Sequence, residues 1–357
     1  MKNHVLKALI GLVFLMSCSK TNVDAEFSEG LEQRGNDNHK IWNLSQVDFN
    51  YAYTLTDGSQ GTGDRKLNYE YSCVRPYGRA VAFSDHAVED GALLWDNSST
   101  MTYNDNFMID VEHAQEYGAD VVRTFHYDSD YKWTGITTEI NGEVIDEEIE
   151  IGPGGQVKSY TSGGVRTEYT WKADNAKTLK IYVQPSAELR SVENSLAFNK
   201  SGINEISRRA TKQLVLKAFK DLQQVAKRSS SLRSIQSDGW VLVGIEENYF
   251  DLNVIEPYRS TAKGYPGTTS DGGYYNLSKN FSTGWKGVLV EPDGTPISDY
   301  YSYERSSYSV KNNLPVVSHY TYIINGYSQD ADGNPIDYRE EGTEHYEYIS
   351  GCNQKEN

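Results

Sequence analysis

Apolar and polar residues alternate along most of this chain, and aromatic side chains mark the alternation. From Trp42 onward, pairs of aromatic residues separated by a single residue recur many times. The pairs are Tyr51/Tyr53, Tyr69/Tyr71, Phe125/Tyr127, Tyr169/Trp171, Tyr301/Tyr303, Tyr320/Tyr322 and Tyr346/Tyr348. Because residues two apart lie on the same face of a β-strand, each pair predicts a strand with one aromatic face.

Short turn signals separate these runs. Asp-Gly or Asn-Gly dipeptides stand at residues 57–58, 90–91, 141–142, 238–239, 271–272, 293–294 and 332–333. They accept the positive φ angles that tight hairpins require. In the acidic run at 143–151, Ile145, Ile149 and Ile151 alternate with acids, which indicates a strand with one solvated face. The pattern predicts a mainly-β fold of antiparallel meander and hairpin sheets.

One segment has helical periodicity. In residues 204–228, apolar side chains recur at three- and four-residue spacing, which predicts one long amphipathic helix packed against the sheets. This helical segment, 201–230, joins two strand-rich halves, 42–190 and 237–352, of a single predicted unit at 42–352. Seven basic residues in the helix are expected to pair with acidic strands; an anionic membrane face is the alternative partner.

The first residues read as a secretory signal at 1–17, with Lys2 and Lys7 before a short apolar run. The run ends in Leu15-Met16-Ser17-Cys18, which resembles the lipobox of bacterial lipoproteins. That resemblance implies cleavage before Cys18, a lipid on Cys18 and attachment to the outer membrane, facing the periplasm or the cell surface. An ordinary cleaved signal is the alternative. Residues 18–41 carry few apolar side chains and would form a lipidated, flexible tether that reaches about 25 Å.

The net charge and composition of the chain limit the kinds of molecule that it is expected to bind. The formal charge is −16, and removal of 1–17, which holds two lysines and no acid, makes it −18, so nucleic acid is not an expected partner. The chain contains 27 tyrosines, which supply buried area with a polar tip. With its lipobox-like start it resembles uncharacterised tyrosine-rich bacterial surface lipoproteins, and residues 125–136 are loosely similar to YD-repeat meanders.

Two cysteines remain after Cys18. In an oxidising compartment, Cys73 and Cys352 are predicted to form a disulfide; two inert buried thiols are the alternative. No CxxC motif is found in the sequence, and no GxSxG, HExxH, P-loop or GxGxxG motif either. The sequence therefore favours a non-enzymatic protein and implies no cofactor.

Two segments are candidate binding sites. Residues 257–287 are rich in Tyr, Ser, Thr and Gly, a composition typical of recognition loops, and rings displayed there would stack on sugars. The candidate ligand-binding residues are Tyr265, Tyr274, Tyr275 and Trp285; alternatively, these rings pack on the sheet. The second segment has oxygen-bearing residues in a pattern partly similar to a calcium loop, at Asp330, Asp332, Asn334 and Asp337, although turn chemistry is the favoured explanation.

The function predicted from the sequence is a membrane-anchored, non-enzymatic envelope lipoprotein that binds glycan or another extracellular polymer. One alternative is a structural or assembly partner of an outer-membrane complex. The other is a lipid carrier in which a sheet wraps around the 204–228 helix.

Overall fold

The computed structural model describes residues 42–73, 78–106, 108–152, 156–187, 239–260, 278–290 and 295–352. They lie in a compact unit that runs from Trp42 to Asn357. Within the described residues no helix is long and apolar enough to cross a bilayer. The predicted signal at 1–17 and the tether at 18–41, including Cys18, lie outside them.

Sixteen strands and one 3₁₀ turn, Pro257–Ser260, make up the described structure. The strands are β1 (Trp42–Leu55), β2 (Gln60–Tyr71), β3 (Ala80–Glu89), β4 (Ala92–Tyr103), β5 (Ile109–Glu116), β6 (Ala119–Tyr127), β7 (Trp133–Ile140), β8 (Glu143–Ile151), β9 (Val157–Ser162), β10 (Val165–Lys172), β11 (Asn175–Val183), β12 (Val241–Ile255), β13 (Asn280–Val290), β14 (Pro296–Lys311), β15 (Leu314–Gln329) and β16 (Pro335–Ser350).

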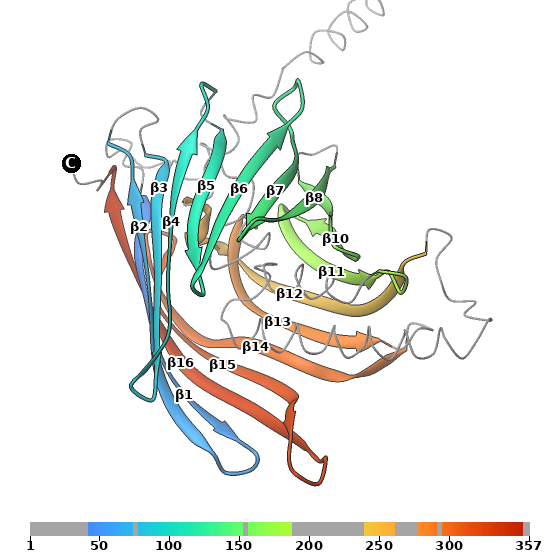
Figure 1. Cartoon of the computed structure of the whole chain (residues 1–357). Helices are drawn as coiled ribbons and strands as arrows, with labels where there is room; N and C mark the ends of the chain where they lie inside the picture. Colours follow the sequence, from blue (N-terminus) through green and yellow to red (C-terminus); the bar gives the residue numbers. More distant parts are fainter. Residues whose placement is uncertain are drawn as a thin grey trace, which may run out of the picture. The chain divides into compact units, whose positions relative to one another are not determined.

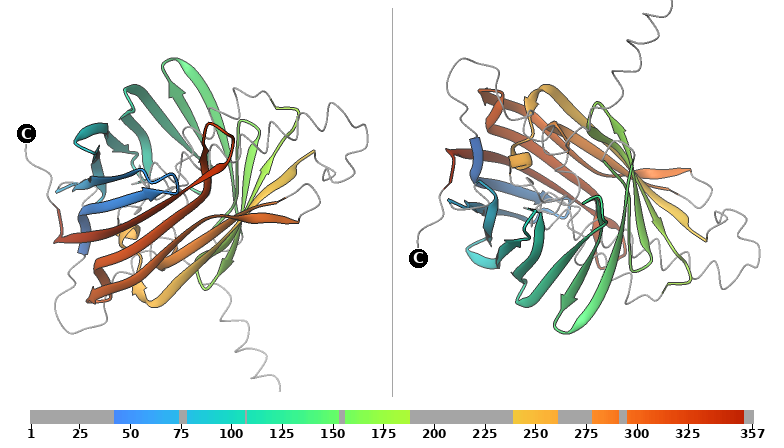
Figure 2. Two further views of the ribbon diagram at one scale, coloured as in Figure 1. Left: turned by 90° about the horizontal axis from the view of Figure 1, so that it is seen from below. Right: turned by 90° about the horizontal axis from the view of Figure 1, so that it is seen from above.

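The strands form one closed antiparallel barrel (Figure 1). Each strand pairs with its neighbours in the chain, and β1 pairs with β16 to close the sheet, with Phe49 opposite Glu344. Both predicted strand-rich regions contribute strands to this barrel, and the end-on views of Figure 2 follow them around the closed sheet.

The predicted fold class is therefore wrong. The sequence pattern predicted antiparallel meander and hairpin sheets packed against one long helix, whereas the described strands form a single closed barrel with no α-helix among the described residues. In the closed barrel, the backbone N–H and C=O groups at the edges of β1 and β16 bond to each other. No other element is therefore needed to cover those edges. The 204–228 segment itself lies outside the described residues.

The turn chemistry explains the short connections. Asp90 and Asn141 have positive φ angles, as do the glycines that follow them, and they join β3 to β4 and β7 to β8. Because strands alternate in direction, these turns and those at 57–58, 117–118 and 332–333 lie at one rim, which we call the hairpin rim. The start of β1 and the end of β16 lie at the opposite rim, which we call the terminal rim.

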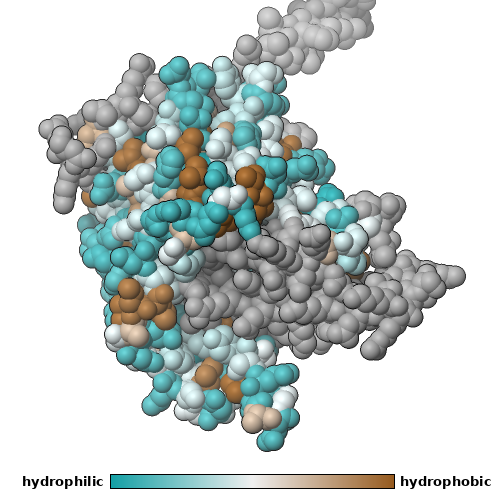
Figure 3. All heavy atoms as spheres, viewed as in Figure 1, coloured by the Kyte–Doolittle hydropathy of each residue, from teal (hydrophilic) through white to brown (hydrophobic). Residues whose placement is uncertain are grey.

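All sixteen strands contribute to one buried apolar cluster, which identifies the inward face of the barrel. The alternating outward positions are polar or charged in the middle of many strands. Examples are Asp48, Lys66, His86, Asp96, Lys180, Lys286, Glu304, Glu341 and His345. Several of these charges pair across strands, as Lys66 does with Asp48 at 3.8 Å. The face shown in Figure 3 is accordingly mostly hydrophilic, with scattered apolar residues.

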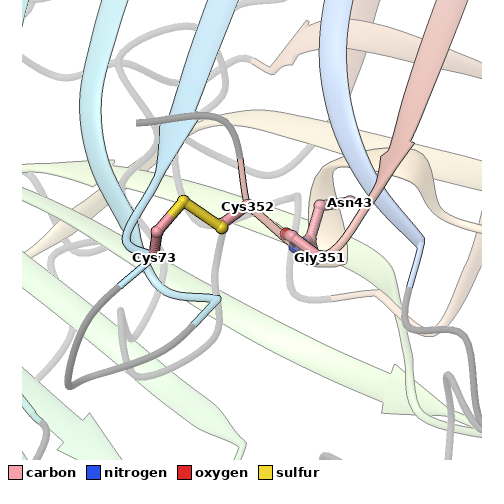
Figure 4. The surroundings of a disulfide bond; sticks show 4 residues. All are labelled: Asn43, Cys73, Gly351 and Cys352. Carbon is pink, nitrogen blue, oxygen red and sulfur yellow. Dashed lines mark hydrogen bonds between the residues drawn. A yellow bond between two sulfur atoms is a disulfide. The ribbon is translucent and has the colours of Figure 1, made fainter. Parts of the chain in front are cut away.

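A disulfide joins Cys73 and Cys352 at the terminal rim (Figure 4). Cys73 follows β2 and Cys352 follows β16, the two strands that flank β1. Beside the bridge, Asn43 of β1 donates a hydrogen bond from Nδ2 to the carbonyl oxygen of Gly351, at 2.6 Å. The bridge thus links the ends of β2 and β16, and the hydrogen bond links β1 to the end of β16. Both contacts lie beside the β1–β16 pairing that closes the barrel, which we call the seam.

Candidate functional site

Aromatic side chains cover the inward face of the barrel from β13 through β16 to β1, and we call this surface the tyrosine wall. Its members are Tyr53, Trp285, Tyr301, Tyr303, Tyr320, Tyr322, Tyr338 and Tyr346, together with Tyr51, whose ring lies over Gly63. Trp285 stacks on Tyr303 with ring centroids 5.4 Å apart, and Tyr303 stacks on Tyr320 at 5.1 Å. Stacked rings on three neighbouring strands therefore form a continuous ladder.

Glycines in the strands make room for these rings. Gly342 lies directly opposite Tyr320 in the register of β15 and β16, and Gly287 lies opposite Tyr301. A Cβ atom added to either glycine would overlap the ring of its partner. The tyrosine rings thus lie flat against the sheet, which explains glycine inside strands where it would otherwise weaken pairing.

Buried carboxylates accept the tyrosine hydroxyls. Glu340 accepts from Tyr320 and Tyr338, both at 2.6 Å, and Glu246 accepts from Tyr301 at 2.9 Å. Burial raises the pKa of Glu340 to about 7, although its two tyrosine hydrogen bonds oppose the rise. Burial likewise raises the pKa of Glu246 to about 7. In both carboxyl groups, burial therefore favours the protonated form.

Glu344 has a different environment because a cation faces it. Arg305 donates to its two oxygens from Nε at 3.0 Å and Nη2 at 3.2 Å, and Tyr303 and Tyr346 add hydroxyl donors at 2.8 and 2.6 Å. Burial alone would raise the pKa of Glu344, but Arg305 and these hydrogen bonds hold it below its usual value. Ser318 completes the network as a further donor. Glu344 is thus a buried, ionised group with saturated acceptors.

The tyrosine wall reaches the hairpin rim at four residues that we call the rim patch: Tyr51, Tyr53, Glu89 and Asp90. The Tyr51 hydroxyl lies 3.1 Å from Glu89 Oε2, and the Tyr53 hydroxyl lies 3.2 Å from Asp90 Oδ2. Tyr53 also stacks on Tyr338 at 5.5 Å. Burial and the nearby Glu89 carboxylate raise the pKa of Tyr53 to about 12, so its hydroxyl stays protonated. Both rings are only half-buried, unlike the deeper members of the wall.

The opposite side of the barrel carries a second buried ionic group. Arg123 of β6 donates to Glu112 at 3.0 Å and to Glu116 at 2.8 and 3.0 Å, and all three side chains are buried. Arg65 forms a similar bidentate pair with Asp85. Each of these hydrogen bonds runs from an arginine to a buried carboxylate, so the arrangement indicates a structural role.

One of the four predicted sugar-stacking residues, Trp285, lies among the described residues, and it packs on the sheet, which was the alternative interpretation. Trp285 is only 6% exposed and faces inward, between Tyr301, Tyr303 and Tyr322. It is therefore a core residue of the tyrosine wall and is not displayed on a surface loop, because its strand position, opposite Tyr303, gives it the inward direction. Tyr265, Tyr274 and Tyr275 lie outside the described residues.

Three of the candidate calcium residues, Asp330, Asp332 and Asn334, lie in the exposed turn between β15 and β16, and the fourth, Asp337, is a partly buried residue of β16. Asp330 accepts hydrogen bonds from the backbone of Asp332 and Asn334 and from the Asn334 side chain, at 2.8–2.9 Å. Asp337 accepts from the backbone of Gly326. The oxygens thus stabilise the turn, and no metal-binding group of three or more His, Cys, Asp or Glu side chains is present among the described residues.

Sequence reasoning missed the carboxylates of the wall. On β16, alternate positions Tyr338, Glu340, Gly342, Glu344 and Tyr346 share one face by simple strand periodicity. That signal was readable, but acids are mostly found on solvated faces, so the face with glutamates would normally be placed outward. The inward direction follows only from the tyrosine and arginine partners that neighbouring strands supply.

No family model matches the chain, and no curated protein matches it. Among solved structures, the chain is similar to a porin-like protein from Bacteroides uniformis, with a TM-score of 0.42 and 10% sequence identity. The similarity covers 86% of this chain and 96% of that one.

Proposed function

We propose that the protein is a lipid-anchored component of the outer membrane whose barrel stands in water beside the bilayer. The observation that carries this proposal is the charged outward face. A barrel that spans a membrane presents an apolar band to the lipid, and a Lys or Arg at the centre of that band costs about 2–4 kcal/mol. Lys66, Lys180 and Lys286 all point outward within their strands, so insertion of this barrel would be strongly unfavourable.

The anchor in this proposal is Cys18, on the basis of its lipobox-like context. We expect Cys18→Ser to move the protein from the membrane fraction to the soluble fraction, because the described strands carry Lys66, Lys180 and Lys286 where an inserted barrel would face lipid. The measurement is fractionation of cells followed by detection of the protein. A matched control is Cys73→Ser with Cys352→Ser, which also replaces cysteine by serine but leaves Cys18 intact.

Two results would contradict the proposal in different ways. If Cys18→Ser remains in the membrane after a high-salt wash and dissolves only in detergent, the barrel itself is inserted. A variant that is released by high salt alone would show that the barrel adheres to the membrane surface by charge, with no need for the lipid.

A second function, glycan binding, is favoured by the rim patch. Tyr51 and Tyr53 are half-buried rings next to the carboxylates of Glu89 and Asp90. A sugar offers a ring face to an aromatic side chain and hydroxyl donors to a carboxylate, so these four groups match both halves of its chemistry. The patch is therefore a candidate glycan site that does not depend on Trp285, which is buried.

We expect the intact protein to bind a member of a glycan array, and Tyr53→Ala to weaken that binding. Stacking of an aromatic side chain on a nucleic-acid base is worth about 1–3 kcal/mol, and a comparable loss for a sugar is roughly 5–150-fold in affinity. Tyr308→Ala is the matched control, because Tyr308 is also half-buried and donates to a carboxylate, Asp251, at 2.6 Å, near the terminal rim. Equal effects of the two variants, or no glycan bound at all, would refute this function.

A further inference from the structure

Exposed apolar side chains stand on three consecutive hairpins of the hairpin rim. Leu93 follows the β3–β4 turn and is 61% exposed, Tyr117 lies in the β5–β6 turn and is 42% exposed, and Val144 follows the β7–β8 turn and is 61% exposed. Because consecutive hairpins are neighbours in this barrel, the three side chains lie on one stretch of the rim. We call Leu93, Tyr117 and Val144 the apolar tips.

The tips belong to hairpins that are bonded to one another. The backbone N–H of Tyr117 donates to Asn97 Oδ1 on β4 at 2.8 Å, and the N–H of Asn141 donates to the Asp120 carbonyl at 3.3 Å. The ring of Tyr117 also contacts Trp95 edge to face, with centroids 6.1 Å apart. These contacts fix the β4, β5–β6 and β7–β8 segments relative to one another, so the tips form a preorganised surface.

Below the tips lies an apolar group separate from the main core. Ala114, Val121 and Ile140 are buried together, and the partly buried Ala119 and Ile145 pack against them. Ala119 is two residues from Tyr117, so this group lies beside the β5–β6 turn. Exposed apolar side chains gathered along one rim are typical of a site that another molecule covers.

The negative charge around the tips favours a partner with basic residues. Residues 96–150 contain fourteen acidic residues and only two basic ones, Arg123 and Lys132. Arg123 is buried in its ion pairs with Glu112 and Glu116, so it contributes little outward field. Beside the tips, the exposed acids are Asp120, Glu139, Glu143 and Asp146. A second copy of this surface and an anionic lipid surface would both be repelled.

We propose that the apolar tips dock a basic, amphipathic segment of a partner protein. Apolar side chains of the segment cover Leu93, Tyr117 and Val144, and its lysine or arginine side chains meet the surrounding carboxylates. The acidic field speeds the encounter and sets the choice of partner, whereas the apolar contact retains it. This inference is independent of lipid at Cys18 and of glycan at the rim patch.

The test uses the full mature protein in detergent and a short, labelled peptide that alternates lysine with leucine. Binding is measured by fluorescence anisotropy. We expect the triple variant Leu93→Ser, Tyr117→Ser, Val144→Ser to weaken binding about tenfold or more, because apolar anchors at the centre of an interface dominate its affinity. The matched control is Leu252→Ser with Glu347→Gln, since Leu252 is 64% exposed on β12 and Glu347 is an exposed acid on β16.

Two further peptides separate the contributions. A lysine–serine peptide should bind at least about tenfold more weakly than the lysine–leucine peptide, and a glutamate–leucine peptide should not bind, because like charges repel. Equal binding of lysine–serine, or binding of glutamate–leucine, would overturn the proposal. An unchanged affinity of the triple variant would overturn it as well, provided that its melting curve matches the parent. Dimers in sedimentation that the triple variant loses would identify a second copy as the occupant instead.

Discussion

Glu344→Ala is expected to lower the free energy of unfolding by about 3–5 kcal/mol, the usual cost of removing one partner from a buried ion pair. Arg305, which is buried, would lose its two hydrogen bonds to the carboxylate and keep a charge that burial makes costly. Tyr303 and Tyr346 would lose the same acceptor. The loss arises from the groups left behind, so it exceeds the net contribution of the pair itself.

The matched control is Glu341→Ala on the same strand. Glu341 also pairs with an arginine, Arg339, at 2.7 Å, but both side chains are more than half exposed. A surface pair contributes about 0–1 kcal/mol, so this variant should unfold almost like the parent. Urea denaturation of the two variants measures the difference. Similar losses for Glu341→Ala and Glu344→Ala would mean that Glu344 is solvated, and the inward assignment of the tyrosine wall would then fail.

The local structure of the barrel could be predicted from the sequence. Alternation at Tyr320/Tyr322 and at Tyr346/Tyr348 indicates strands, and both pairs lie in strands, β15 and β16. Asp90-Gly91 joins two neighbouring strands, as its turn chemistry predicts, because its requirement for positive φ is a property of the dipeptide itself. The acidic run at Glu143–Ile151 is a strand, as the alternation of isoleucine with acids indicated. These features depend only on residues close in sequence.

Closure and the candidate site could not be predicted in this way. The pairing of β1 with β16 joins residues about three hundred positions apart, such as Phe49 and Glu344, and nothing local at either strand specifies the other. The direction of Trp285 shows the same limit. Its neighbours in sequence are small and polar, which is typical of an exposed loop, while the rings that bury it come from β14 and β15. The carboxylates face inward for the same nonlocal reason.

The Cys73–Cys352 disulfide is expected to contribute up to about 5 kcal/mol to stability, because in the chain-entropy model the benefit grows with the length of the closed loop. Here the two cysteines are 279 residues apart. We expect the double variant Cys73→Ser, Cys352→Ser to unfold at a clearly lower urea concentration than the parent. A smaller loss than the model gives is still consistent with a bridge, because a denatured chain that retains structure gains less entropy from reduction.

Reduction and thiol titration distinguish the bridge from two buried thiols. A reducing agent should bring the parent to the stability of the double variant and leave the double variant itself unchanged, since only the bridge responds to it. In the denatured, unreduced protein, Cys73 and Cys352 should be unavailable to a thiol reagent. Two free thiols besides Cys18 would refute the bridge. The seam between β1 and β16 would then depend on backbone pairing and on contacts such as Asn43 to Gly351, and its strands would be the first to open.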